Sequence, residues 1–330
     1  MHPALSVIFF TSVSGSGYGL LFLAGLAIAS APLAIGPRLE ILAIVVGGAF
    51  AAAGLASSML HLGQPQRAWR ALSQWRSSWL SREGVAALCS FVPMLVLVVL
   101  LWRLAHASAF AAATPGLATA LRIGGIVLAA ASAITVWCTA RIYTSLKTIA
   151  AWHNAYVLPG YLLFALLGGA GWFWALAALA GAGDWLARES LPILVAALAA
   201  LGAVLKRSYW AFIDAAPAAS TAESATGLGR FGRVRGSEAP HTEENYLTRE
   251  MGFALARKHA ARLRVIALVL FGALPVALAI PALALHSSQL VALYAVVAAL
   301  AATAGTFVER WLFFAEARHV VMLYYAGTRN

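Results

Sequence analysis

Eight long apolar stretches fill most of this 330-residue chain and limit its possible folds more than any other feature. A helix of about 20 apolar residues crosses the roughly 30 Å hydrocarbon core of a bilayer. The stretches lie at residues 5–31, 39–62, 84–106, 118–141, 155–181, 190–210, 264–285 and 289–312. We therefore predict an all-α integral membrane protein, a single membrane domain over residues 1–330 with eight transmembrane helices in a bundle.

The composition agrees with a membrane protein and argues against a β-barrel. The chain is 62% hydrophobic and 11% charged, whereas soluble domains are about half apolar and about a quarter charged. Membrane strands would alternate in polarity over roughly ten residues. These stretches are continuously apolar, which is typical of helices that satisfy their backbone hydrogen bonds internally.

The basic residues predict the orientation of the chain. With eight spans, both termini and the second, fourth and sixth loops share one side of the membrane. All but four of the 23 Lys and Arg residues belong to that side; the exceptions are Arg38, Arg103, Arg122 and Arg188. Because cytoplasmic loops are rich in Lys and Arg, we expect both termini in the cytoplasm of a bacterium and the span bundle in its inner membrane. The net charge of +11 then reflects topology rather than nucleic-acid binding.

The richest polar cluster joins the second and third spans, in the sequence HLGQPQRAWRALSQWRSSWLSREG. One interpretation is an aromatic belt with arginines that reach the headgroups, with Glu83 at a helix N-terminus. The other is a quinone headgroup site, because a histidine and a partly buried carboxylate suit the two protons that quinol oxidation releases. The residues of this candidate site are His61, Glu83, Arg67, Trp79 and Arg82.

The segment from Trp137 to Asn154 lies on the same side of the membrane as His61. Its polar residues either anchor the interface or form a second wall of the quinone site. The candidates for that wall are Arg141, Tyr143 and His153.

A glycine pair in the first span and a glutamate pair at the end of the eighth each have two interpretations. Gly15 and Gly19 in the first span form a small-residue pair, which favours close helix packing. The alternative is that it opens a gap for a ligand beside Ser14 or Tyr18. Glu309 and Glu316 are seven residues apart and share a helix face. They form either a solvated helix end or a polar seam against the loop between spans 2 and 3.

The long cytoplasmic loop, residues 211–263, mixes acids and bases. Its glycine-rich early part, STAESATGLGRFGRVRG, predicts no regular structure, and its later part predicts an amphipathic helix from Asn245 to Leu263. A loop of this length is usually functional or disordered, and its charges suit docking to a soluble partner. The docking candidates are Arg230, Arg233, Arg235, Tyr246 and Arg249.

Several unusual strings resemble the membrane anchor subunits of the dimethyl sulfoxide reductase type, a family that includes anchors of cytoplasm-facing sulfite dehydrogenases. They are MHPALSVIFFT, HLGQPQRAW, WRSSWLSRE, ARIYTSLKTIAAWHN, KRSYW, HTEENYLTREMGFALARKH and ERWLFFAEARH. They occur between Met1 and His319, so the resemblance covers almost the whole chain.

The resemblance implies an anchor with no catalytic site of its own and without haem or iron–sulfur cluster. It also implies a molybdopterin catalytic subunit and an iron–sulfur subunit as partners, and transient quinone or quinol binding. In this family, a histidine after the second span and a glutamate at the start of the third are associated with quinol binding, and these match His61 and Glu83. The direction of electron flow, either S-oxide reduction or sulfite oxidation, is left open.

Two other functions remain as alternatives. A haem b carrier would need histidine pairs facing each other within the bilayer, whereas His61, His106 and His153 lie at or beyond predicted span ends. A small-molecule transporter would show inverted repeats or broken helices. The sequence shows no convincing four-helix repeat, and the span centres are nearly free of charge.

Overall fold

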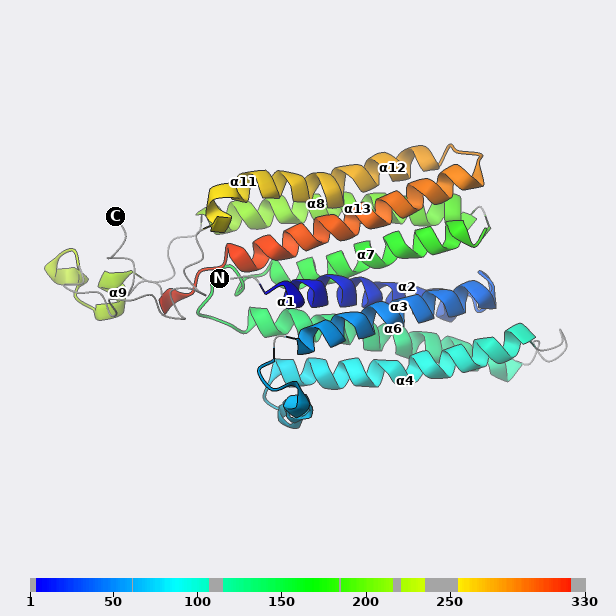
Figure 1. Ribbon diagram of the computed structural model, residues 1–330, viewed down its shortest axis with the longest axis horizontal. Helices are drawn as coiled ribbons and strands as arrows, with labels where there is room; N and C mark the ends of the chain where they lie inside the picture. Colours follow the sequence, from blue (N-terminus) through cyan, green and yellow to red (C-terminus); the bar gives the residue numbers. More distant parts are fainter. Residues whose placement is uncertain are drawn as a thin grey trace.

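The computed structural model describes residues 4–60, 62–106, 115–183, 185–215, 221–234 and 255–321. Within these residues, eight helices are long and apolar enough to cross a membrane, and they run roughly parallel to one another (Figure 1). The prediction of an all-α membrane protein is confirmed.

The eight spans combine regular helices with a few π-helical turns. The first comprises α1 (Leu5–Phe9), a π-helical turn (Phe10–Ser14) and α2 (Gly15–Ser30). The others are α3 (Pro37–Met59), α4 (Trp79–His106), α6 (Pro115–Thr144), α7 (Val157–Leu179), a π-helical turn (Trp185–Ser190) with α8 (Leu191–Ala215), α11 (Leu255–Ala267) with a π-helical turn (Leu268–Ala273) and α12 (Leu274–Ala282), and α13 (Ser288–Ala315).

Local signals explain where several helices begin and end. Pro37 opens α3 directly after Gly36, whose φ of 84° suits glycine. Gly181, at φ 66°, follows the end of α7. Ser287 caps α13 by accepting a hydrogen bond from the Leu290 backbone N–H at 3.4 Å.

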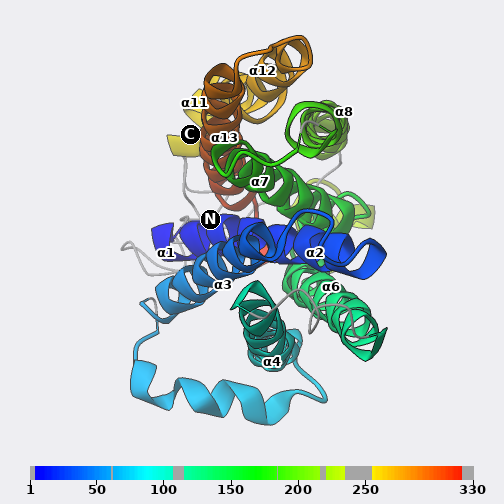
Figure 2. The same cartoon turned by 90° about the vertical axis from the view of Figure 1, so that its right-hand side faces the viewer.

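The spans form two groups of four in chain order (Figure 2). α2, α3, α4 and α6 pack together as one group, and α7, α8, α12 and α13 as the other. α2 and α6 of the first group contact α7 of the second. The contact of α2 with α7 is the most extensive helix pair among the described residues, so the two groups are joined into one bundle.

Glycines of α2 let this helix pack against three neighbours. A Cβ atom at Gly17 would lie 2.6 Å from the Gly47 carbonyl oxygen of α3, and one at Gly25 would lie 2.7 Å from the Gly125 carbonyl oxygen of α6. A Cβ atom at Gly19 would collide with the Ala165 carbonyl of α7. Gly15 has open space instead, so the predicted pair contributes only one of its two glycines to close packing.

Apolar side chains on the outside of the bundle suit contact with lipid. On α4, they include Leu88, Val92, Leu95, Val99 and Trp102, which are all exposed. The core contains large side chains that are fully buried, among them Phe164, Trp174 and Phe271. An exposed apolar belt around a packed core is the expected arrangement for a helical bundle surrounded by hydrocarbon.

Three shorter helices lie at the end of the bundle that holds the described N-terminal residues (Figure 1). A 3₁₀ helix, Pro65–Gln74, lies between α3 and α4 and is called the surface helix below. After α8 come α9 (Ala222–Thr226) and a 3₁₀ turn (Gly229–Phe231). The expectation of no regular structure there is wrong, because Thr221 and Ser224 form a reciprocal capping box that starts α9.

Candidate functional site

The first polar group of the candidate site gathers where the surface helix leads into α4. The Arg82 guanidinium donates to the backbone carbonyl oxygens of Trp75 and Arg76, at 3.0 and 2.7 Å. The same guanidinium lies over the Trp79 ring, 4.3 Å from its centroid. Arg82 therefore fastens the end of the surface helix to the start of α4.

Glu83 lies inside the helix group one residue further on. Its side chain is 4% exposed, and its carboxylate accepts a hydrogen bond from the Thr139 hydroxyl of α6. The expected span began at residue 84, whereas α4 begins at Trp79. The extra turn places Glu83 within the helix, so its carboxylate lies between α4 and α6 rather than in solvent.

α6 brings a second guanidinium to the same aromatic ring. The Arg141 Cζ atom is 5.1 Å from the Trp79 centroid, and Trp137 packs edge-on against Trp79 at 5.3 Å. Arg141 Nε is buried and has no hydrogen-bond partner among the described residues. A buried N–H without a partner is unfavourable, so Arg141 Nε is a donor that the described protein groups leave unsatisfied.

Tyr18 of α2 completes the surroundings of the carboxylate. It is buried and lies close enough to Glu83 to interact with it electrostatically. Sequence reasoning named Tyr18 only as a possible gap-lining residue, and it missed Thr139. A threonine in an apolar span gives no signal on its own, because only the packing of α6 on α4 brings it to Glu83.

The other two residues of the predicted second wall lie elsewhere. Tyr143 belongs to an aromatic cluster with Trp152, Tyr161, Phe313 and Phe314, where the two helix groups meet. Its ring stacks on Tyr161 with 5.6 Å between centroids, and it remains within electrostatic range of Glu83. His153 holds the end of α6 instead, because its ring Nδ1 is 2.6 Å from the Thr144 carbonyl oxygen.

The remaining predicted residues have three different outcomes. Arg67 is exposed on the surface helix. Arg230 and Arg233 are exposed near the 3₁₀ turn that follows α9, with Arg230 over the Phe231 ring at 4.6 Å. The residues that lie outside the described part of the chain are His61, Arg235, Tyr246 and Arg249.

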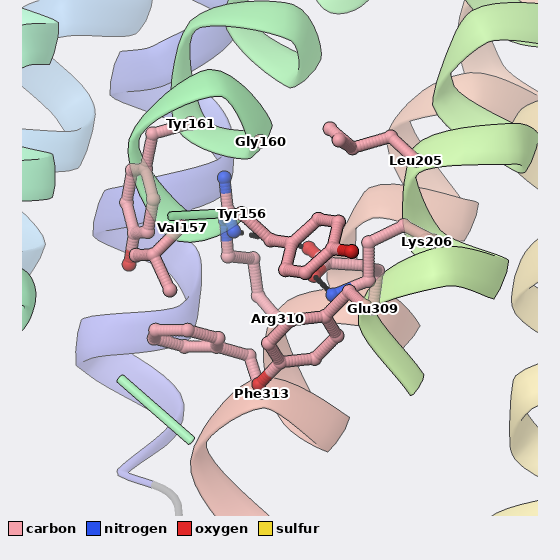
Figure 3. Close-up of a pocket in the computed structure, with 10 residues that line it drawn as sticks. Tyr156, Val157, Gly160, Tyr161, Leu205, Lys206, Glu309, Arg310 and Phe313 are labelled. Carbon is pink, nitrogen blue, oxygen red and sulfur yellow. Dashed lines mark ion pairs between the residues drawn. The ribbon is translucent and has the colours of Figure 1, made fainter. Parts of the chain in front are cut away.

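A second polar group, buried in the other helix group, was not predicted as a site. Lys206 Nζ of α8 is 2.6 Å from Glu309 Oε1 of α13, and Arg310 Nη1 is 3.1 Å from Glu309 Oε2. Figure 3 shows these side chains around a cavity of about 10 Å³, with Tyr156 and Tyr161 beside them. A space of this size has room for about one water molecule.

Two more ion pairs continue this group toward the exposed end of the bundle. Arg264 of α11 binds Glu316 at 2.8 Å and Asp214 at 2.6 Å. The three cations and three carboxylates of these ion pairs balance one another in charge. We call them together the ionic cluster. Its members are Lys206, Asp214, Arg264, Glu309, Arg310 and Glu316.

The ionic cluster corrects one sequence-based alternative. The polar seam of Glu309 and Glu316 was expected to close against the loop between spans 2 and 3, but it closes against Lys206 and Arg264 of α8 and α11. Both acids find basic partners because α11 packs on α13, while α8 and α13 both pack against α7 and α12. The available signal was a basic residue near the end of span 6 opposite an acid near the end of span 8.

Comparisons with known proteins identify the family. The model of the DMSO reductase anchor subunit family matches residues 1–315. The chain is 32% identical to the C subunit of sulfite dehydrogenase from Allochromatium vinosum, over 98% of this chain and 99% of that protein. It is also 32% identical to the C chain of anaerobic dimethyl sulfoxide reductase from Escherichia coli, over 46% of this chain and 49% of that one.

These matches confirm the resemblance inferred from the sequence strings, and the apolar spans agree with an anchor embedded in a membrane. The chain thus belongs to the family of DMSO reductase membrane anchor subunits.

Proposed function

We propose that this chain exchanges electrons between the quinone pool and an iron–sulfur partner subunit, as the quinone-binding anchor of a molybdopterin oxidoreductase. The observation that carries the proposal is the group formed by Trp79, Arg82, Glu83, Thr139 and Arg141. It lies at the end of the bundle that holds the described N-terminal residues, called the charge-rich end below (Figure 1). We call this group the Trp79–Glu83 site.

The side chains of this site fit a quinone headgroup. Arg141 Nε is a buried donor without a partner among the described residues, and it suits a carbonyl oxygen. The Glu83 carboxylate is a buried acceptor that suits a hydroxyl. The flat rings of Trp79 and Trp137 suit an aromatic headgroup.

Each residue then has a separate role in the proposed exchange. A quinol supplies two electrons and two protons when it is oxidised. Glu83, held in place by the Thr139 hydrogen bond, takes up one of these protons from a bound hydroxyl. The second proton passes to water at the nearby end of the bundle, and both electrons pass to the iron–sulfur partner. Arg141 stabilises the negative charge that develops on the headgroup oxygen. Arg82 positions Trp79 and the start of α4.

The partners and the orientation belong to the same proposal. We infer an iron–sulfur subunit and a molybdopterin subunit on the cytoplasmic side, with Arg230 and Arg233 in the docking surface because both are exposed there. The full-length match to a sulfite dehydrogenase subunit favours a substrate that is an oxidised sulfur compound.

The test measures binding of a quinol analogue to the purified native complex. Glu83→Gln should weaken binding roughly tenfold to a hundredfold, because a hydrogen bond to a charged group contributes about 1.5–3 kcal/mol. Glu40→Gln is the matched control, since Glu40 is also buried but lies near the opposite end of the bundle.

Two outcomes would count against the proposal. Unchanged binding in the Glu83→Gln complex would exclude Glu83 from the site. A native preparation that contains neither molybdenum nor iron–sulfur subunits, under mild detergent conditions, would remove the proposed partners.

A further inference from the structure

The surface helix has a regular side-chain pattern that its 3₁₀ geometry creates. A 3₁₀ helix has three residues per turn, so side chains three apart in sequence lie above one another. In Pro65–Gln74 and the turn after it, this period lines up Arg67, Arg70 and Arg76. It also lines up a separate apolar ridge of Trp69, Leu72 and Trp75.

Contacts with α4 fix the surface helix in place. A Cβ atom on Gly84 would be 2.9 Å from Leu72 Cδ2, so the middle of the apolar ridge packs directly on α4. The Ser81 hydroxyl donates to the Ala71 carbonyl oxygen, and Arg82 holds the final turn. The helix is thus a fixed element and not a loose loop.

The surface helix lies to the side of the bundle. The surface helix, light blue between α3 and α4, runs across the direction of the spans and lies beyond α4, outside the outline of the bundle (Figure 2). It does so at the end of the bundle where α4 begins (Figure 1). A helix in this position lies in the plane of the membrane interface, beside lipid rather than above the spans.

The exposed side chains match the chemistry of that interface. Trp69 and Trp75 are 67% and 51% exposed, and indole rings favour the headgroup region. The Arg70 and Arg76 guanidinium groups lie over these rings, at 5.5 and 5.4 Å. The sequence from Leu62 to Arg82 contains no acid, so the basic ridge of Arg67, Arg70 and Arg76 has no carboxylate within its own segment.

We propose that the surface helix binds anionic phospholipid headgroups, with its tryptophans in the interface and its arginine ridge on the lipid phosphates. Guanidinium groups bind phosphates with two parallel hydrogen bonds. Basic residues near an anionic membrane surface each contribute about 1 kcal/mol of binding. Because Arg82 joins the surface helix to α4, bound lipid would also hold the start of α4 in place.

The experiment compares phosphatidylglycerol with phosphatidylcholine binding to the purified full-length chain by native mass spectrometry. The unchanged chain should prefer phosphatidylglycerol. The triple substitution Arg67→Gln, Arg70→Gln and Arg76→Gln should reduce that preference roughly a hundredfold, since each arginine contributes about fivefold.

The matched control removes three exposed arginines from the same end of the bundle, by Arg207→Gln, Arg262→Gln and Arg318→Gln. It has the same charge change and should keep the preference. Hydrogen–deuterium exchange on the unchanged chain in lipid nanodiscs provides a readout without mutation. Exchange at residues 65–76 should be slower in phosphatidylglycerol than in phosphatidylcholine.

Three results would overturn the proposal. The first is an equal loss of preference in both triple variants, which would indicate net charge alone. The second is identical exchange at residues 65–76 in the two lipids. The third is a surface-helix variant that keeps its lipid preference but no longer co-purifies with partner subunits, which would assign the basic ridge to a protein partner.

Discussion

At the scale of single residues, Glu309 is a buried acid whose two ion-pair partners are also buried. It is 1% exposed and lies between two cations, Lys206 and Arg310. Transfer of charges out of water is expensive, and the expense is offset only while the charges remain paired. Glu309 therefore supports packing of the second helix group through charge balance rather than through its size.

Glu309→Gln should lower the stability of the chain strongly, because it leaves Lys206 and Arg310 as two buried cations without an acid between them. Loss of one partner from a buried pair costs about 3–5 kcal/mol. Thermal unfolding followed by size-exclusion chromatography would show the effect. The double variant Lys206→Met with Glu309→Gln should regain part of the stability, whereas a double variant that is less stable than Glu309→Gln would contradict this account.

Thr139 has a different role, because its hydroxyl positions a carboxylate that we propose contacts quinol. Thr139→Val keeps the shape of the side chain and removes the hydrogen bond to Glu83. We expect about tenfold weaker binding of a quinol analogue, the effect of about 1.4 kcal/mol. Thr135→Val, one turn earlier on α6 and buried to a similar degree, should leave binding unchanged.

At the scale of elements, α2 contacts three helices of the bundle through glycine. Gly17, Gly19 and Gly25 each meet the backbone of a different neighbour. In lipid, helices associate through close packing instead of the hydrophobic effect. A methyl group at such a contact therefore separates two helices rather than filling a space.

Gly19→Ala should destabilise the contact between the two helix groups, because its Cβ atom would collide with the Ala165 carbonyl of α7. Overpacking of this kind costs about 1–3 kcal/mol, which a lower unfolding temperature would report. Gly15→Ala is the control, since its Cβ atom would meet open space. Equal stability of the two variants would show that the contact can relax without loss.

At the scale of the whole molecule, the structure separates two kinds of polar chemistry. The Trp79–Glu83 site lies in the first helix group and the ionic cluster in the second. The aromatic cluster around Tyr143 lies between them, and Arg310 contacts it from the second group, 3.8 Å from the Tyr161 centroid. These packed rings therefore form one direct contact between the two polar regions.

The proposed orientation can be tested with two cysteine variants at opposite ends of the bundle. Ala225→Cys in α9 is exposed at the charge-rich end, and His286→Cys is exposed between α12 and α13. With a membrane-impermeant maleimide on spheroplasts, His286→Cys should react at once and Ala225→Cys only after the membrane is opened. The unchanged chain, with Cys89 and Cys138, measures the background; the reverse pattern would invert the proposed topology.

The membrane class, the helical architecture and the family all follow from signals in the sequence alone. Continuous apolar runs have no other stable form in lipid, and the strings around residues 61–83 and 137–154 are specific enough to indicate an anchor subunit. Among the candidate residues, sequence reasoning also indicated Trp79, Arg82, Glu83 and Arg141, which the structure brings together. These signals are local, so they can be recognised before the chain is folded.

The tertiary structure decides which polar residues of different helices contact each other. Thr139 joins Glu83 because α6 packs on α4, and Glu309 joins Lys206 because α8 and α13 both pack against α7 and α12. Tyr143 turns toward the junction of the two groups for the same reason. Each contact depends on the rotation and distance of two helices that are far apart in sequence. Small residues and side-chain shape set that packing, and hydrophobic length alone does not encode it.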